Sequence, residues 1–172
     1  MWQTLKQIAR VGCISEPAPA DSANVTRGDA EPLRDELARL LGRALAVRVV
    51  DAGSCNGCEL EINALGNPYY NLEGLGVHFV ASPRHADLLL VSGPVSRHME
   101  QALRRTYEAM PEPRLVVAAG ECACTGGVFG ESYASCGRVG NVLPVDVTVA
   151  GCPPSPQALL EGILRAVRRQ AR

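Results

Sequence analysis

This sequence of 172 residues lacks an excess of charge of either sign, since 17 basic and 18 acidic residues leave a formal net charge of −1. With no overall basic field, no nucleic-acid partner is expected. No window approaches the roughly 20 apolar residues that span a bilayer. The first ten residues also lack the apolar run of a signal peptide. We therefore expect a chain that neither crosses a membrane nor leaves the cell by the secretory route.

A complete set of disulfides is also missing, because the cysteine count of 7 is odd. In a chain without a secretory signal, thiols are more often metal ligands or reactive groups than a disulfide framework. Cys55 and Cys58 lie in the glycine-flanked stretch GSCNGC, directly after a predicted strand. Two thiols at this spacing can ligate a metal centre, act as a redox dithiol or close a small disulfide.

Hydrophobic patterning predicts an α/β fold. Apolar runs predict strands over residues 44–50, 87–91, 114–119 and 142–150, with a weaker strand over 76–80. Helical spacing predicts helices over residues 1–10, 32–43, 59–65 and 96–110, and a final helix that begins at Ser155 and Pro156. Strands that alternate with helices indicate a doubly wound parallel sheet flanked by helices.

The chain divides into two expected parts. Residues 1–30 are predicted to form an amphipathic helix and an extended arm, because periodicity is lost over 15–28, where Pro, Ala, Ser, Asp and Asn dominate. Residues 31–172 are predicted to form the α/β domain. The amino-terminal helix, with Trp2 on its apolar face, docks either on its own domain or on a partner or membrane surface.

Four cysteines follow three different predicted strands by a few residues. They are Cys55, Cys58, Cys122 and Cys152. Because the carboxyl ends of parallel strands meet at one edge of the sheet, we expect these four thiols to lie together. Four thiolates suit a four-iron cluster, and a structural zinc ion would take the same ligands. A second CxxC pair, which would favour zinc, is missing.

Glycines near these cysteines are expected to let backbone amides approach the sulfur atoms. The candidates are Gly57, Gly126, Gly127 and Gly151. The other cysteines are expected to be small buried apolar residues, and they are Cys13, Cys124 and Cys136.

Four collinear motifs also resemble a known family. They are CNGCELEI at residues 55–62, SPRHAD at 82–87, GECACTGGVF at 120–129 and PVDVTVAGCPPSP at 144–156. Together they resemble the small subunit of group 4, membrane-bound [NiFe] hydrogenases of the formate hydrogenlyase type, and the homologous 20-kDa subunit of respiratory complex I. The resemblance covers residues 45–170. Complex I subunits carry two adjacent cysteines at the first position, so the two-residue spacer between Cys55 and Cys58 favours the hydrogenase side.

The resemblance implies a flavodoxin-like domain with one [4Fe-4S] cluster on Cys55, Cys58, Cys122 and Cys152, and it leaves Cys124 outside the ligand set. It implies electron transfer between the nickel–iron centre of a large subunit and ferredoxin-like subunits, in a complex with membrane ion-translocating subunits. The chain is then a peripheral part of an oxidoreductase at the cytoplasmic face of the cell membrane, with no turnover alone. A quinone-reducing or nickel-free relative and a structural zinc-binding assembly module are the alternatives.

Glu59 and Glu61 follow the second cysteine of the first motif. A carboxylate beside a redox centre can take a proton when electrons move, and proton transfer by Glu59 is a hypothesis on this ground. The alternative is a solvated or ion-paired helix start, where the helix dipole favours acidic residues.

Overall fold

The computed structural model describes residues 2–11, 35, 39 and 42–170. The expected amino-terminal helix is present as α1 (Trp2–Val11), and Trp2 is exposed on it. The arm expected over 15–28, Cys13 and almost all of the helix expected over 32–43 lie outside the described residues. The division of the chain near residue 30 stays a prediction.

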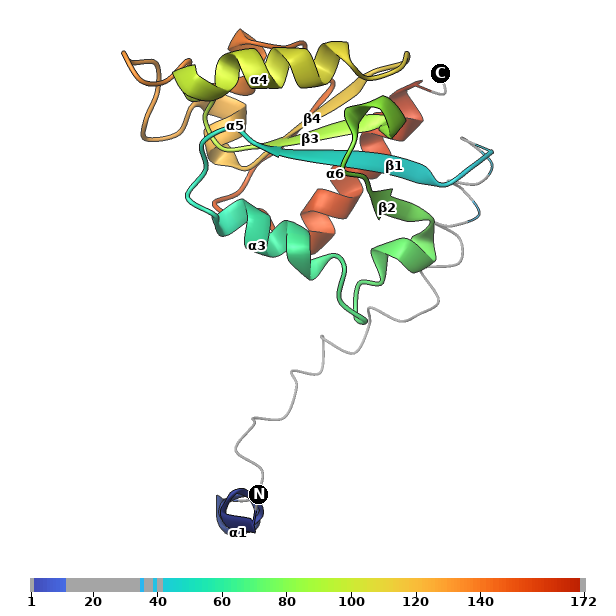
Figure 1. The fold of residues 1–172 in the computed structure, drawn as a ribbon, viewed down its shortest axis with the longest axis vertical. Helices are drawn as coiled ribbons and strands as arrows, with labels where there is room; N and C mark the ends of the chain where they lie inside the picture. The colour runs from blue at the N-terminus through green and yellow to red at the C-terminus, as the bar shows by residue number, and fades with distance from the viewer. Residues whose placement is uncertain (1, 12–34, 36–38, 40–41, 171–172) are drawn as a thin grey trace.

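One parallel sheet of five strands, in the order β2-β1-β3-β4-β5, forms the centre of the fold (Figure 1). The strands are β1 (Leu45–Asp51), β2 (Val77–Phe79), β3 (Leu88–Ser92), β4 (Leu115–Ala119) and β5 (Val147–Val149). From β1 the chain first adds β2 on one side and then places β3 on the other. This order confirms the predicted flavodoxin-like, doubly wound fold. Its switch point, where loops diverge and ligands bind in such sheets, lies between β1 and β3.

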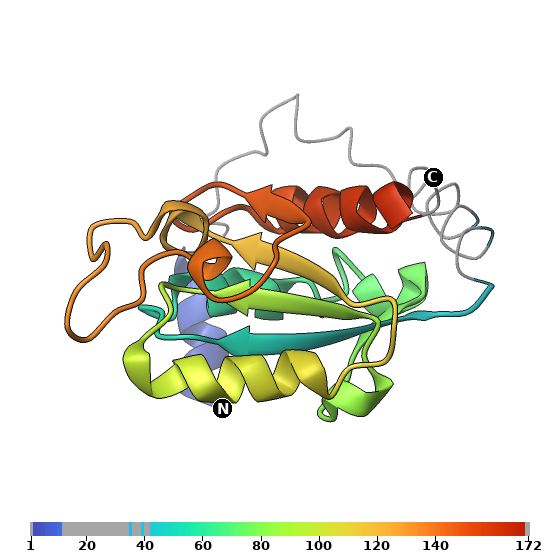
Figure 2. The ribbon, with the colours of Figure 1, turned by 90° about the horizontal axis from the view of Figure 1, so that it is seen from above.

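Helices cover both faces of the sheet (Figure 2). Residues of α3 (Gly57–Ala64) and α6 (Pro156–Gln170) pack on one face. Residues of α4 (Arg97–Glu108) and of the short α5 (Glu121–Thr125) pack on the other. The described 3-10 helices span Leu72–Leu75 (η3), Pro83–His85 (η4) and Val139–Asn141 (η5).

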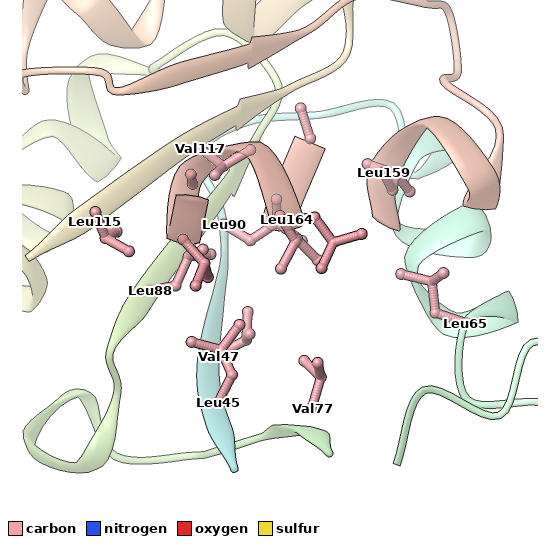
Figure 3. Packing of buried hydrophobic residues seen from close by; sticks show 14 of the residues in the cluster. Leu45, Val47, Leu65, Val77, Leu88, Leu90, Leu115, Val117, Leu159 and Leu164 are labelled. Atoms are coloured by element: carbon pink, nitrogen blue, oxygen red, sulfur yellow. The ribbon is translucent and has the colours of Figure 1, made fainter. Parts of the chain in front are cut away.

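The central strand β3 contributes to both hydrophobic layers because successive strand residues point to opposite faces. Leu88 and Leu90 pack in the layer that includes Leu159 of α6 (Figure 3). Leu89 packs in the opposite layer with Leu103 of α4. Each fully buried leucine stabilises the fold by about 1.5–3 kcal/mol relative to an exposed one. This burial fixes β3 between the two hydrophobic layers. It therefore also fixes the position of the carboxyl end of β3.

The last strand is shorter than predicted. The expected strand over 142–150 is reduced to Val147–Val149, and the residues before it form a turn. Leu143 N–H donates to the Val139 carbonyl at 3.0 Å, and both side chains are buried. Pro144 follows, and its lack of an N–H disfavours a ladder position. The first apolar residues of this run are therefore buried in a turn. Hydrophobicity alone does not distinguish a buried turn from a buried strand.

Two helix starts near the carboxyl edge of the sheet are set locally. Ser96 caps α4 as predicted, since its hydroxyl accepts a hydrogen bond from the Met99 N–H at 3.3 Å. The helix α3 begins at Gly57, two residues earlier than predicted, after Asn56 in the left-handed conformation (φ 72°). Asparagine tolerates this conformation better than most residues. Cys58 consequently lies in the first turn of a helix, whereas Cys55 lies in the loop before it.

Candidate functional site

Three loops at the carboxyl edge of the sheet each carry a cysteine to the same place. Cys55 and Cys58 follow β1, Cys122 follows β4, and Cys152 follows β5. Burial raises the pKa of Cys58 to about 11, with further contributions from Glu59 and from the other three thiols. The four thiols are thus near enough for the other three to act on Cys58, and their joint ligation of a metal stays a prediction.

The pKa of Cys122 is also raised, first by burial and then by Cys152 and Cys55. Cys58 and Cys122 are partly buried, whereas Cys55 and Cys152 are exposed. Both raised pKa values favour the protonated thiol. Binding of a metal by Cys58 and Cys122 would therefore release their protons.

Two glycines leave the space that the sulfur atoms occupy. A Cβ on Gly120 would lie 2.5 Å from Cys58 Sγ, and a Cβ on Gly127 would lie 2.8 Å from Cys122 Sγ. Both glycines have positive φ angles, of 91° and 54°, which side chains disfavour. Gly127 was among the glycines expected near the sulfurs, whereas Gly120 was missed. The available signal was its position between the end of a strand and a cysteine.

Hydrogen bonds join two of the three loops and order the third. Glu121 N–H donates to the Gly151 carbonyl at 2.8 Å, which joins the loops of Cys122 and Cys152. The Asp51 carboxylate accepts from the N–H groups of Gly53 and Ser54 at 2.8 and 2.7 Å, which orders the chain before Cys55. The thiols are therefore presented by short, fixed turns.

The donor set fits a soft metal centre. Four thiols from three loops, with no histidine among them, suit an iron–sulfur cluster or zinc. The adjoining glycines keep side chains out of the space beside Cys58 and Cys122. Among the described residues, no three His, Cys, Asp or Glu side chains are arranged to hold a metal ion.

The remaining described cysteines lie in other surroundings. Cys124 Sγ lies 3.5 Å from the carbonyl oxygen of Val149 and packs against the hydrophobic layer on the α4 side. Cys136 is buried in that layer, with its Sγ 3.3 Å from a carboxylate oxygen of Glu100. Burial is the first cause of the raised pKa of each thiol. Both positions agree with the expectation that these cysteines serve packing.

Glu59 has two hydroxyl partners that the sequence did not indicate. Ser54 Oγ donates to one carboxylate oxygen at 2.5 Å, and Ser92 Oγ donates to the other. Ser92 is the last residue of β3 and is fully buried. Two serines thus hold the side chain of Glu59, which differs from the solvated or ion-paired side chain that is the alternative for a helix start.

The structure is a parallel α/β fold with four cysteines, Cys55, Cys58, Cys122 and Cys152, just after the carboxyl ends of its strands. We call this edge of the sheet the thiol edge. The chain belongs to the family of the 20-kDa subunit of NADH–ubiquinone oxidoreductase, whose pattern matches residues 55–166. All four clustered cysteines lie within the match. The resemblance carried by the motifs is confirmed, and an iron–sulfur cluster is expected in this family.

Relatives of this chain are subunits of oxidoreductase complexes. The chain is 44% identical to the probable membrane-bound hydrogenase subunit mbhJ of Pyrococcus furiosus, over 80% of this chain and 82% of that protein. It is 48% identical to an NADH-quinone oxidoreductase subunit of Desulfovibrio desulfuricans, over 72% of this chain and 67% of that protein. The likeness to both branches agrees with the two relatives that the motifs indicated.

A solved structure shares the fold. A chain of the membrane-bound sulfane sulfur reductase, an archaeal respiratory membrane complex, aligns with a TM-score of 0.64 at 32% identity, over 80% of this chain and 75% of that one. Relatives therefore occur in membrane-bound complexes. In the part of the chain that the structure describes, no helix is long and apolar enough to cross a bilayer.

Proposed function

We propose that this chain is the electron-transfer small subunit of a membrane-associated [NiFe] hydrogenase complex, with one [4Fe-4S] cluster on Cys55, Cys58, Cys122 and Cys152. The observation that carries the proposal is that Cys55, Cys122 and Cys152 all contribute to the raised pKa of Cys58, although the four thiols come from three loops. When bound, such a cluster supplies a carrier for one electron at a time.

The residues around the thiols support this role because they leave space at the sulfur atoms and access for a partner protein. Gly120 and Gly127 leave space at the sulfur atoms of Cys58 and Cys122, and the Glu121–Gly151 hydrogen bond joins the loops of Cys122 and Cys152. The exposure of Cys55 and Cys152 leaves one side of the site open to a partner protein. An electron carrier needs such an approach, because electrons have to enter and leave through neighbouring centres.

Exposed apolar side chains on the ligand-bearing segments support a partner at this edge. Val128 and Phe129 follow Gly127 directly and are 98% and 62% exposed, and Leu60 is 61% exposed two residues after Cys58. Apolar side chains of this kind are typical of the core of a protein interface. The partner proposed here is the hydrogenase-like large subunit.

The remaining partners and the location follow from the same proposal. Ferredoxin-like iron–sulfur subunits exchange electrons with this chain, and membrane ion-translocating subunits complete the complex. The chain is peripheral and lies at the cytoplasmic face of the cell membrane. The similarity to mbhJ, a probable membrane-bound hydrogenase subunit, supports the association with a membrane complex.

A quinone-reducing or nickel-free complex is the second candidate. The similarity to an NADH-quinone oxidoreductase subunit and to a sulfane sulfur reductase supports it. The two-residue spacer between Cys55 and Cys58 favours the hydrogenase. The sequence of the large subunit and the nickel content of the complex discriminate between them. A CxxC pair near each end of that subunit, together with bound nickel, is expected for the hydrogenase, and the absence of both contradicts it.

Anaerobic purification of the complex through this chain tests the cluster itself. We expect about four irons and about four sulfides per chain at this site, together with a reducible cluster signal in electron paramagnetic resonance. Stoichiometric zinc without sulfide would instead support the structural zinc-binding assembly module.

The ligand set is tested by two serine variants of matched chemistry. Cys152→Ser is expected to lose the cluster, because it removes one of the four ligands. Cys124→Ser is the control, since it removes a thiol of α5, two residues after Cys122, that lies against the Val149 carbonyl and outside the proposed ligand set. An intact cluster in Cys152→Ser, or an equal loss in both variants, contradicts the assignment. Proton transfer by Glu59 stays a prediction.

A further inference from the structure

The carboxylate of Glu59 is held at both of its oxygen atoms. Ser54 Oγ lies 2.5 Å from Oε2, and Ser92 Oγ donates to Oε1. Both oxygen atoms of the side chain thus have a serine hydroxyl partner. The carboxylate therefore has a defined position on the first turn of α3, next to Cys58.

The fold builds this position from two strands. Ser92 ends the fully buried strand β3, and Ser54 lies in the loop that leaves the neighbouring strand β1. Gly93 permits the close approach of the two segments, because a Cβ there would lie 2.5 Å from the Ser54 backbone nitrogen. Ser54 Oγ also accepts from the Asn56 N–H at 3.0 Å. The serine hydroxyls are thus attached to rigid backbone.

We propose that Ser92 and Ser54 are positioning residues that hold the Glu59 carboxylate beside the Cys58 ligand, and that this fixed negative charge lowers the reduction potential of the bound cluster. The inference rests on the proposed function, since it concerns the cluster assigned to the four cysteines.

Electrostatics gives the direction in which the Glu59 charge shifts the reduction potential. Reduction adds one electron, and therefore one negative charge, to the metal–thiolate group. A nearby fixed carboxylate repels that charge and disfavours the reduced form, most strongly where burial limits screening.

The test is a redox titration of the anaerobically purified complex, with the potential read from the resonance signal of the cluster. Glu59→Gln keeps the size of the side chain, replaces one acceptor oxygen by an NH2 donor and removes the charge. We expect the cluster to become about tenfold easier to reduce, which is a rise of about 59 mV for a one-electron couple. Glu73→Gln is the matched control, because it removes the same charge from an exposed site that precedes β2, away from the thiol edge. Its potential is expected to equal that of the wild type.

Ser92→Ala tests the positioning role. Loss of the hydroxyl frees one carboxylate oxygen, and the potential is expected to rise by less than in Glu59→Gln. The double variant is expected to match Glu59→Gln alone, because Ser92 acts through Glu59. A purely structural effect of Ser92 would instead add to the effect of Glu59→Gln.

Each outcome has one meaning. Unchanged potentials in Glu59→Gln and Ser92→Ala, with iron and sulfide retained, overturn the inference and leave the proposed function intact. Absence of a cluster in the wild-type complex overturns the proposed function instead. If Glu59→Gln does not retain a cluster, Ser92→Ala decides by its potential, and loss of the cluster in both variants overturns the electrostatic role.

Discussion

Cys58 is the thiol whose ionisation the site suppresses most clearly, and at the residue scale this has a consequence for pH. Burial, followed by Glu59 and the three other thiols, raises its pKa from 9.0 to about 11. Its partly buried position in the first turn of α3 places it deeper than Cys55 and Cys152. The metal-free protein thus prefers a protonated thiol at this position.

The free energy of unfolding of the metal-free chain is expected to depend on pH because of Cys58. A group whose pKa is raised by folding stabilises the fold fully below its unfolded pKa, and this contribution is lost as the pH rises through the folded pKa. Stability should therefore fall between pH 9.0 and about 11 because of Cys58. Solvent screening limits the loss to about 1 kcal/mol.

Urea unfolding of the metal-free chain and of Cys58→Ser, below and above this window, measures the effect. The variant should lack the part of the pH dependence that Cys58 causes, while other groups titrate equally in both proteins. Parallel pH profiles for the two proteins would contradict the prediction.

At the scale of elements, the loop after β4 is shaped by Gly120. Its backbone has a φ of 91°, and the space beside its Cα is taken by Cys58 Sγ from a different loop. A side chain there would meet two costs, one from the backbone conformation and one from the displaced sulfur. Each is on the order of 1–3 kcal/mol.

Gly120→Ala is therefore expected to lower both cluster content and thermal stability. Gly76→Ala is a control that separates the two costs, because Gly76 has a φ of 82° and a Cβ added to it would meet no atom within 4 Å. We expect Gly76→Ala to lose some stability and to keep its iron and sulfide. Equal iron contents in the two variants would show that the contact with Cys58 is unimportant.

At the scale of the whole molecule, the thiol edge carries exposed aromatic side chains. Phe129 is 62% exposed and Tyr133 is 98% exposed, both in the segment that follows α5. If this edge binds the large subunit, these rings are buried in the complex. Truncating buried aromatic residues at interfaces commonly costs about 2 kcal/mol or more.

The double variant Phe129→Ser with Tyr133→Ser is thus expected to reduce the yield of co-purified large subunit, while the chain keeps its cluster. Tyr69→Ser is the control, because Tyr69 is 63% exposed but follows the carboxyl end of α3, away from the thiols. Equal recovery of the large subunit with both variants would argue against an interface at this edge.

Residues with a simple periodicity were predictable before the structure. The apolar run over 87–91 matches β3 within one residue, because a strand buried on both faces needs apolar side chains at every position. The run over 142–150 was misleading, because Val142 and Leu143 are buried from a turn in which both N–H groups donate to the Val139 carbonyl. A hydrophobic run predicts that its residues are buried. Whether the backbone is a strand or a turn there depends on the neighbouring elements.

The sequence by itself determined the order of the strands along the chain, the α/β class, the family and the four cysteines at strand ends. These follow from local patterns and from motif spacing, which do not require distant contacts. Only the tertiary structure decided that Gly120 adjoins Cys58 and that Ser92 binds Glu59. These pairs come from different strands and loops, and their contact depends on how the parallel strands are aligned in the sheet. The stretch GSCNGC thus supplies two of the proposed ligands, and the pairing of β1 with β3 brings Ser54 and Ser92 to the Glu59 carboxylate beside them.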